Sequence, residues 1–213
     1  MRVYHIFKRA IDILVSLIII LILSPLLLLL SIWVKTSSKG PIIYKHIRIG
    51  KNGKHFEVCK FRSMIVGARD LQKRGVPDER LITSAGSFMR KTFLDELPQL
   101  FNVLKGDISL IGPRPLDKEA FGRWVEKDKE WKNIVKTKPG MTSIESVADY
   151  LSSAERIKFE EHFKGLLGRD VYDDFEHHRY VLDSYYSQNE SFWLDLRIIV
   201  YTLILTLKKV FSA

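Results

Sequence analysis

The stretch Lys91–Pro115, KTFLDELPQLFNVLKGDISLIGPRP, holds the densest set of structural and chemical signals in the 213-residue chain. Two adjacent carboxylates, Asp95 and Glu96, come just before the Pro98–Lys105 segment, which carries apolar residues at helical spacing and is followed by Gly106. Proline is tolerated in the first turn of a helix and glycine is common just past its end, so this segment is predicted to be a short helix. The two acids then lie at or just ahead of its N-terminus, where free N–H groups and the helix dipole favour negative charge.

The end of the same stretch presents one arginine between two prolines. Gly112-Pro113-Arg114-Pro115 is a turn signal that fixes the backbone around Arg114. Leu97, which precedes Pro98, is expected to keep its backbone out of the helical region. An acid pair at a helix start more often caps the helix than performs catalysis. Together with a rigidly presented arginine, however, the pair indicates a site for phosphate and a metal ion.

The composition favours an acidic partner. The chain has 34 Lys+Arg against 25 Asp+Glu, a formal net charge of +9, which suits nucleic acid, anionic lipid or phosphorylated substrates. Zinc-finger spacings and RNA-binding signatures are absent from the sequence, so nucleic acid is not expected as a partner. The single cysteine, Cys59, excludes an internal disulfide. The length suits one domain with a hydrophobic core.

Residues 13–34 form an almost wholly apolar run, which as a helix would measure about 33 Å and could cross a bilayer. Ser24-Pro25 falls in its middle, where proline removes a backbone hydrogen bond and kinks a helix. The Ser24 hydroxyl is a local partner for the carbonyl that Pro25 leaves free. Basic residues flank both ends of the run, so the positive-inside rule gives no orientation. Taken alone, these residues favour a kinked single-pass anchor.

Three segments of the central stretch resemble the signature of the bacterial sugar transferases: Leu94-Asp95-Glu96-Leu97-Pro98-Gln99-Leu100, Asn102–Asp107 and Ser109–Pro115. These proteins are monotopic phosphoglycosyl transferases, which load a sugar-1-phosphate onto polyprenyl phosphate. The resemblance continues at Lys60-Phe61-Arg62-Ser63-Met64, at Gly86 and Arg90, and at Leu194–Ile199, so it runs nearly from end to end.

The resemblance implies that an NDP-sugar, with UDP the favoured nucleotide, reacts with polyprenyl (undecaprenyl) phosphate to give a polyprenyl diphosphosugar and NMP, which starts glycoconjugate or polysaccharide assembly. Asp95 would be the nucleophile and Glu96 would hold Mg²⁺, an ion that takes one or two carboxylates plus phosphate oxygens. The cations expected to bind phosphate are Lys60, Arg62, Arg90, Arg114 and Lys138. A non-catalytic membrane scaffold and a nucleotide-sugar hydrolase are the alternatives; the intact acid pair opposes the first and the membrane segments oppose the second.

For the N-terminal run the resemblance implies a re-entrant helix that breaks at Ser24-Pro25 and enters and leaves by one leaflet. The predicted organisation is therefore a membrane-embedded helix over residues 1–36 and a cytoplasmic catalytic domain over residues 37–213, on the cytoplasmic face of the bacterial inner membrane. Lys8-Arg9-Ala10-Ile11-Asp12 resembles the family's membrane-anchor motif. Lys8 and Asp12, four residues apart, are expected to pair at the membrane surface.

The remaining segments predict an α+β fold that is mainly helical. Ile43–Ile49 and His55–Phe61 flank Asn52-Gly53, and Asn-Gly between two such runs is a strong signal for a β-hairpin, on which Lys60 and Arg62 would share a face. Glu119–Lys136 is predicted to be one amphipathic helix. Ser191–Phe211 is predicted to be an amphipathic helix lying on the anionic leaflet, because its uncharged part is too short to span a bilayer. Anionic lipid is thus an expected partner, and a homodimer is left open.

The chain departs from the family pattern after Gly140. Lys138-Pro139-Gly140-Met141-Thr142 resembles a family loop, but Ser143-Ile144-Glu145-Ser146 stands where Gly-Trp-Ala-Gln is common, and Ile134 replaces an arginine. The sugar is therefore not predicted. Acids and histidines also gather at Asp173, Asp174, Glu176, His177 and His178, without a familiar ligand spacing, which is more typical of a solvated helix face than of a metal site.

Overall fold

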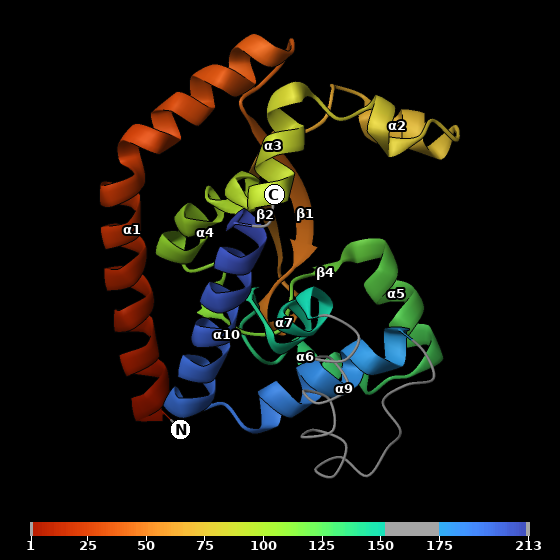
Figure 1. Cartoon of the computed structure of the whole chain (residues 1–213). Coiled ribbons are helices and arrows are strands. Elements are labelled where there is room, and N and C mark those ends of the chain that lie inside the picture. Colours follow the sequence, from red (N-terminus) through yellow and green to blue (C-terminus); the bar gives the residue numbers. More distant parts are fainter. Residues whose placement is uncertain (1, 152–174, 212–213) are drawn as a thin grey trace.

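The computed structural model describes residues 2–151 and 175–211 (Figure 1). A long N-terminal helix, α1 (Arg2–Ser37), runs along one side of a folded unit made of short helices and two small sheets. The main elements that follow are β1 (Ile43–Ile49), β2 (His55–Phe61), α2 (Ala68–Lys73), α3 (Ser84–Thr92), α4 (Gln99–Lys105), β3 (Ser109–Ile111), β4 (Leu116–Asp117), α5 (Lys118–Lys127), α6 (Trp131–Ile134), β5 (Gly140–Thr142), α7 (Ile144–Tyr150), α9 (Phe175–Gln188) and α10 (Phe192–Phe211). The predicted mainly helical α+β class is confirmed.

The predicted hairpin is confirmed with both of its strands. β1 and β2 pair antiparallel, with Ile43 opposite Phe61 and Ile49 opposite His55, and β4 adds a third strand beside β1. The connecting turn is a short 3-10 helix, η1 (Lys51–Gly53), in which Asn52 has a φ of 57°. Asparagine is one of the few residues that accept this left-handed conformation. A second, parallel pair joins β3 to β5.

The acid pair lies in a one-turn 3-10 helix, η3 (Leu94–Glu96), directly ahead of α4. The predicted helix and its glycine cap are confirmed, since α4 ends at Lys105 and Gly106 has a φ of 94°. The expectation for Leu97 is wrong: its φ of −52° and ψ of −37° are helical. The chain continues from η3 into α4 through Leu97, and the burial of the α4 side chains Leu100 and Val103 overrides the preference of a residue before proline.

The prediction of one helix over Glu119–Lys136 is also wrong, because α5 and α6 are separate helices. Asp128, between them, has an extended backbone, and its Oδ1 accepts a hydrogen bond from the Glu130 amide at 2.8 Å. Such a local side-chain bond competes with the helix. Trp124 and Trp131 pack across the break with ring centroids 4.4 Å apart, so the apolar spacing belongs to two helices that share one core.

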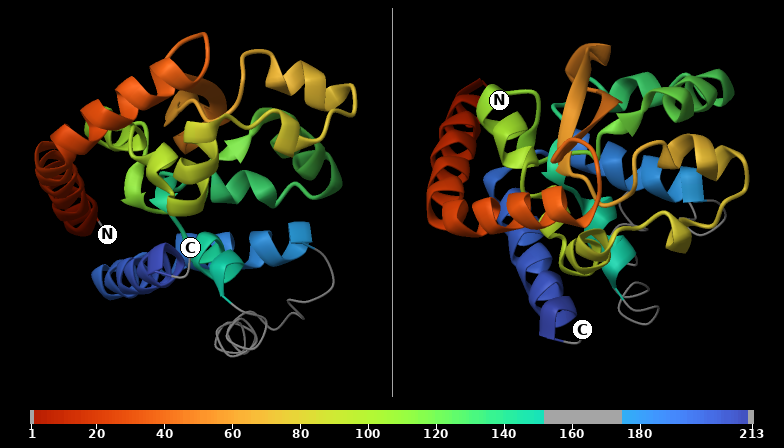
Figure 2. Two further views of the ribbon diagram at one scale, coloured as in Figure 1. Left: turned by 45° about the horizontal axis from the view of Figure 1, so that its top comes forward. Right: turned by 90° about the horizontal axis from the view of Figure 1, so that it is seen from above.

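α1 is, among the described residues, the one helix long and apolar enough to cross a membrane. It bends in its middle (Figures 1 and 2), and Pro25 is the proline inside it. Pro25 has no N–H for the carbonyl of Leu21, and the Ser24 Oγ donates to that carbonyl at 2.9 Å. The predicted local partner of Ser24 is thus confirmed.

Lys8 does not pair with Asp12, so that prediction is wrong. Its ammonium forms an ion pair with Asp195 of α10, and the same carboxylate accepts hydrogen bonds from the hydroxyls of Tyr4 at 2.7 Å and Tyr186 at 2.6 Å. A spacing of four residues permits a pair on a helix but contributes only a few tenths of a kcal/mol, about 0.2–0.5. The buried carboxylate of Asp195 is a stronger partner.

Arg9 and Asp12 also bind the folded unit, whereas the family motif implied a role at the membrane surface. Asp12 is only 4% exposed and accepts hydrogen bonds from Ser109 Oγ at 2.8 Å and from the Leu110 amide at 3.0 Å. Arg9 donates to two carbonyls in the last turn of α4 at 2.6 and 2.8 Å, where helix carbonyls lack partners within the helix. These side chains fasten the start of α1 to the rest of the chain.

α10 buries one face against the folded unit and exposes apolar side chains on its other faces. Asp195, Ile198 and Leu205 are buried, while large apolar side chains on the other faces are exposed: Phe192, Trp193, Leu196, Val200, Tyr201, Leu203, Ile204 and Leu207. α1 exposes a similar set, and the rings of Phe7 and Phe192 lie 6.4 Å apart where the two helices meet. Exposed apolar surface of this extent marks a membrane or partner contact.

Substituting Asp195 with asparagine is expected to lower the free energy of unfolding by about 3 kcal/mol, because the largely buried Lys8 ammonium loses its counter-charge. Thermal unfolding of the detergent-purified chain measures this loss. Asp70→Asn, on the exposed surface of α2, is the matched control and is expected to change stability by less than about 0.5 kcal/mol. The double variant Lys8→Met/Asp195→Leu removes both charges and should lose less than Asp195→Asn alone; an equal or larger loss would contradict this account.

Candidate active site

Side chains from five segments meet around a small cavity of about 30 Å³ at the N-terminal end of α4. The sequence predicted three of its lining residues, Lys60, Glu96 and Arg114. The full lining is Arg48, Val58, Lys60, Glu96, Gln99, Arg114, Pro115 and Met141. Three cations therefore surround one carboxylate, an arrangement that attracts a phosphate group.

Glu96 is held as an anion within this cavity. Its Oε1 accepts a hydrogen bond from Lys60 Nζ at 2.5 Å, and its Oε2 accepts one from Gln99 Nε2 at 3.0 Å. Burial alone would raise the pKa of Glu96, but the charges of Lys60 and Arg114 and these hydrogen bonds bring that pKa below its ordinary value. Glu96 is consequently ionised at neutral pH.

Asp95 stands in a different environment from its neighbour. Its side chain is buried, and this burial raises the pKa of Asp95 to about 6, against the opposing charges of Lys60 and Arg90. The nearby Glu96 carboxylate raises the pKa further. Two adjacent acids with pKa values displaced in opposite directions indicate two chemical roles, one of them for a poorly solvated and therefore reactive carboxylate.

Arg114 is positioned by the segment in which the chain departs from the family pattern. Its Nη1 donates a hydrogen bond to Ser146 Oγ at 3.0 Å. The hydroxyl of Ser143, the N-cap of α7, donates to the same Ser146 Oγ at 2.9 Å. The backbone carbonyl of Arg114 accepts a hydrogen bond from Arg179 at 2.9 Å. Residues of the departing segment therefore support Arg114 in this chain.

The sequence pattern did not single out Arg48 or Gln99. The hairpin register nevertheless contains the signal for Arg48, because Tyr44 lies opposite Lys60 and Arg48 opposite Phe56 on the same face of the two-strand ladder. Gln99 is the first residue of α4, one turn past Glu96, and its amide reaches that carboxylate. Neither role follows from residue type alone.

The other predicted phosphate-binding cations lie in three different places. Arg90 is exposed on α3 and does not line the cavity, although its charge lowers the pKa of Asp95. Arg62 is 4% exposed and donates to the carbonyls of Lys39 at 2.8 Å and Ser38 at 2.7 Å, at the end of α1. Lys138 lines a separate cavity, together with Arg9 and Asp12. The structure thus does not bring Arg62 and Lys138 to the acid pair.

The side chains available as metal ligands determine how a metal ion could bind. Within the part of the chain that the structure describes, no three His, Cys, Asp or Glu side chains gather as a metal site. Asp173 and Asp174 lie outside the described residues, as do the side chains of Glu176, His177 and His178. Glu96 supplies an ionised carboxylate, which fits Mg²⁺ when phosphate oxygens of a substrate complete its coordination.

Comparison with known proteins places this site in a family. The family profile described as bacterial sugar transferase matches residues 3–209, and the chain belongs to this family. The resemblance seen in the acid-pair motif is thereby confirmed.

Several relatives carry names that state an activity, among them one of Klebsiella pneumoniae and one of Salmonella typhimurium. The chain is 34% identical over 206 residues to a UDP-glucose:undecaprenyl-phosphate glucose-1-phosphate transferase of Klebsiella pneumoniae, covering 93% of this chain and 39% of that protein. It is 36% identical over 219 residues to an undecaprenyl-phosphate galactose phosphotransferase of Salmonella typhimurium, covering 95% and 40%. The chain thus spans about two fifths of the length of these relatives. It covers 87% of the uncharacterized sugar transferase EpsL of Bacillus subtilis, at 34% identity.

Proposed function

We propose that this protein transfers a sugar-1-phosphate from an NDP-sugar, with UDP the favoured nucleotide, to polyprenyl phosphate, giving a polyprenyl diphosphosugar and NMP. The observation that carries the proposal is that the buried carboxyl of Asp95 adjoins in sequence an ionised Glu96, whose side chain lines a cavity together with Arg48, Lys60 and Arg114. Two relatives named as undecaprenyl-phosphate sugar phosphotransferases add support. The cavity has room for a phosphate-sized group, so the nucleoside and sugar would lie outside it.

In the first step an Asp95 carboxylate oxygen attacks the β-phosphorus of the NDP-sugar. The bond from that phosphorus to the bridging oxygen breaks, and NMP leaves with this oxygen and its electron pair. Asp95 then carries the sugar phosphate as an acyl phosphate. In the second step a phosphate oxygen of the polyprenyl phosphate attacks the same phosphorus, which forms the diphosphate and regenerates the free carboxylate.

The charged groups around Asp95 reduce repulsion between anions. A carboxylate approaches a diphosphate only when cations offset the negative charge. Lys60, Arg48 and Arg114 supply fixed positive charge, and the guanidinium of Arg114 suits two-point binding of phosphate. Mg²⁺ would be held by Glu96 and the substrate's phosphate oxygens; when bound, it withdraws electron density from the phosphorus and offsets charge on the leaving group.

We also propose that α1 is re-entrant and that the active site lies on the cytoplasmic face of the inner membrane. Both ends of α1 bind the same folded unit: Asp12 and Arg9 fasten its start, while Arg62 and the buried Val34 fasten its end. A helix that spans a bilayer places its ends about 30 Å apart on opposite faces. The bend (Figure 2) and the exposed apolar side chains between the two attachments support entry and exit through one leaflet.

The exposed apolar face of α10 would lie in the same leaflet surface as α1. Phe192 meets Phe7, and Arg197 and Lys208 are exposed on α10, where they would face anionic lipid headgroups. Polyprenyl phosphate would then reach Asp95 by moving within the leaflet.

The reaction class is tested by measuring NMP release from a panel of UDP-sugars, with Mg²⁺, in the presence and absence of polyprenyl phosphate. Net turnover that requires the lipid, with formation of a diphosphate-linked sugar lipid, is expected for one or more members of the panel. Turnover that is equally fast without lipid would indicate a nucleotide-sugar hydrolase. Absence of both turnover and metal-dependent UDP-sugar binding would indicate a scaffold.

The raised pKa of Asp95 predicts that the rate falls at acid pH, which gives the pH profile a descending acid limb. Only the ionised carboxylate attacks phosphorus, so kcat/KM should fall tenfold for each pH unit below about 6, the pKa of this carboxyl in the metal-free protein. Lys60 lowers that pKa, so Lys60→Gln should move the limb to higher pH, whereas Lys54→Gln, on the exposed turn, should leave it in place. A limb near pH 4 at low Mg²⁺ would contradict the assignment.

A further inference from the structure

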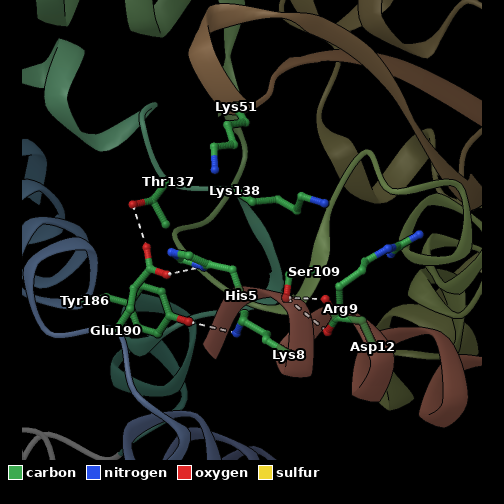
Figure 3. Close-up of a pocket in the computed structure, with 10 residues that line it drawn as sticks. All are labelled: His5, Lys8, Arg9, Asp12, Lys51, Ser109, Thr137, Lys138, Tyr186 and Glu190. Atoms are coloured by element: carbon green, nitrogen blue, oxygen red, sulfur yellow. Dashed lines mark hydrogen bonds and ion pairs between the residues drawn. The ribbon is translucent and has the colours of Figure 1, made fainter. Parts of the chain in front are cut away.

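A second, larger cavity of about 170 Å³ is shown in Figure 3. It lies near the C-terminal end of α4, because Arg9, one of its lining residues, donates to carbonyls in the last turn of that helix. It is enclosed by the start of α1, the η1 turn, β3, the segment before β5 and the segment between α9 and α10. Its lining is His5, Lys8, Arg9, Asp12, Lys51, Ser109, Thr137, Lys138, Tyr186 and Glu190. Since about 10–15 Å³ suffices for one water, this volume admits a hydrated polyatomic anion.

Most charged groups in this cavity already have partners. Lys8 binds Tyr186 at 3.0 Å and Asp195, and Asp12 binds Ser109. Arg9 is held by the carbonyls at the end of α4. Glu190 accepts a hydrogen bond from Thr137 at 2.9 Å and lies 3.6 Å from His5. These contacts, several of which appear as dashed lines in Figure 3, form a fixed polar wall.

Lys51 and Lys138 differ from their neighbours, because neither side chain makes a hydrogen bond or ion pair to any residue that the structure describes. They come from separate segments, the hairpin turn and the segment before β5, and both are drawn without dashed lines in Figure 3. Burial lowers the pKa of Lys138, and the positive charges of Arg9 and Lys51 lower it further, while the negative charges of Asp12 and Asp107 offset part of this shift. Two ammonium groups are thus brought to one cavity, and neither forms a direct ion pair with a carboxylate that the structure describes.

We propose that this cavity binds a phosphate group between Lys51 and Lys138, and that the bound phosphate couples the start of α1 to the hairpin turn and the segment before β5. Phosphate offers several acceptor oxygens and up to two negative charges, which match two ammonium groups that approach from different elements. The inference is independent of the proposed transfer reaction. α4 separates the two sites by about 10 Å along its axis, so this phosphate is not the one that reacts at Asp95.

A lipid headgroup and free phosphate share this chemistry. The aromatic side chains Phe7 and Trp193 are exposed close in sequence to Lys8 and Glu190, which line the cavity, so an acyl chain could lie beside it. The test therefore compares inorganic phosphate with dioctanoyl phosphatidylglycerol, using sodium chloride at matched ionic strength and dioctanoylglycerol as the respective controls.

Thermal unfolding of the detergent-purified chain is followed for the wild type, for Lys51→Gln/Lys138→Gln and for Lys54→Gln/Lys132→Gln. The last variant removes the same charge from exposed lysines outside the cavity. We expect a saturable rise in Tm of about 2–4 °C in the wild type and in this control, and no saturable rise in Lys51→Gln/Lys138→Gln. Removing two repelling charges should not lower the Tm of the cavity variant in chloride alone. Lys51→Gln by itself, on the exposed turn, should weaken the response.

Comparison of the two probes, inorganic phosphate and dioctanoyl phosphatidylglycerol, shows which kind of phosphate the cavity binds. A rise with inorganic phosphate assigns the site to the free anion, and a rise with the phosphatidylglycerol alone assigns it to a lipid headgroup. An undiminished rise in Lys51→Gln/Lys138→Gln would place phosphate elsewhere, at Arg114 above all, and would overturn the proposal. Absence of any rise in the wild type with either probe would overturn it too. Because Tm needs no turnover, neither result bears on the transfer reaction.

Discussion

Asp95→Asn is expected to reduce transfer of sugar phosphate by at least about 10³-fold, because an amide cannot form the acyl-phosphate bond. The substitution keeps the shape of the side chain, so Lys60 and Arg114 should keep their positions in the neighbouring cavity. The measurement is the rate of formation of the polyprenyl diphosphosugar, with enzyme concentrations adjusted to detect slow turnover.

Stability provides the control for this variant. The Asp95 carboxyl is buried and its pKa is raised to about 6, so at pH 7.5 the folded protein holds a charge that its surroundings disfavour. Replacing it with a neutral amide should leave Tm unchanged or raise it. A variant that keeps more than a tenth of wild-type activity would remove Asp95 from the role of nucleophile. If Asp95→Asn loses its folded structure as well as its activity, the loss says nothing about the role of Asp95. Asp95→Ala would then be measured in its place.

Arg114→Lys is expected to lower kcat/KM by about 10²-fold, because lysine keeps the charge but lacks the planar fork that binds two phosphate oxygens. The same substitution breaks the hydrogen bond to Ser146. Steady-state kinetics with varied NDP-sugar measures the effect, and Lys132→Arg, on the exposed surface of α6, serves as the matched control for exchange of the two basic side chains. Unchanged kcat/KM in Arg114→Lys would exclude two-point binding by this residue.

Ser146 offers a second way to examine the same arginine. Ser146→Ala removes the hydroxyl that receives Arg114 Nη1 and should give a smaller loss than Arg114→Lys, about tenfold, while Ser146→Thr restores the hydroxyl and should recover most of the rate. A purely structural role in α7 would instead lower Tm in Ser146→Ala without this recovery of rate by threonine.

The elements set by local chemistry were predictable from the sequence. Asn52-Gly53 determines where the hairpin turns, Gly106 determines where α4 ends, and Ser24 satisfies the carbonyl that Pro25 leaves without a donor. In each case the residues that decide the outcome are neighbours in the chain. The mainly helical α+β class followed from these elements together with the apolar spacing of the helices.

The errors arise where tertiary partners compete with local ones. Lys8 is close enough to Asp12 on one helical face, but Asp195, far away in sequence, offers a buried carboxylate. Arg62, two residues after Lys60, was expected on the same strand face, yet β2 ends at Phe61 and Arg62 donates to carbonyls at the end of α1. The acid pair, Lys60 and Arg114 were identified because the family motif specifies them, whereas Arg48 required the strand register.

The central claim is a covalent phosphosugar on Asp95, and intact-protein mass spectrometry tests it most directly. The purified chain is mixed with Mg²⁺ and a UDP-sugar that supports turnover, without polyprenyl phosphate. We predict one equivalent of UMP and a mass increase equal to one sugar phosphate, located at Asp95 by peptide mapping and removed when polyprenyl phosphate is added. Release of UMP only in the presence of the lipid, with no change in protein mass at any time, would contradict a covalent step.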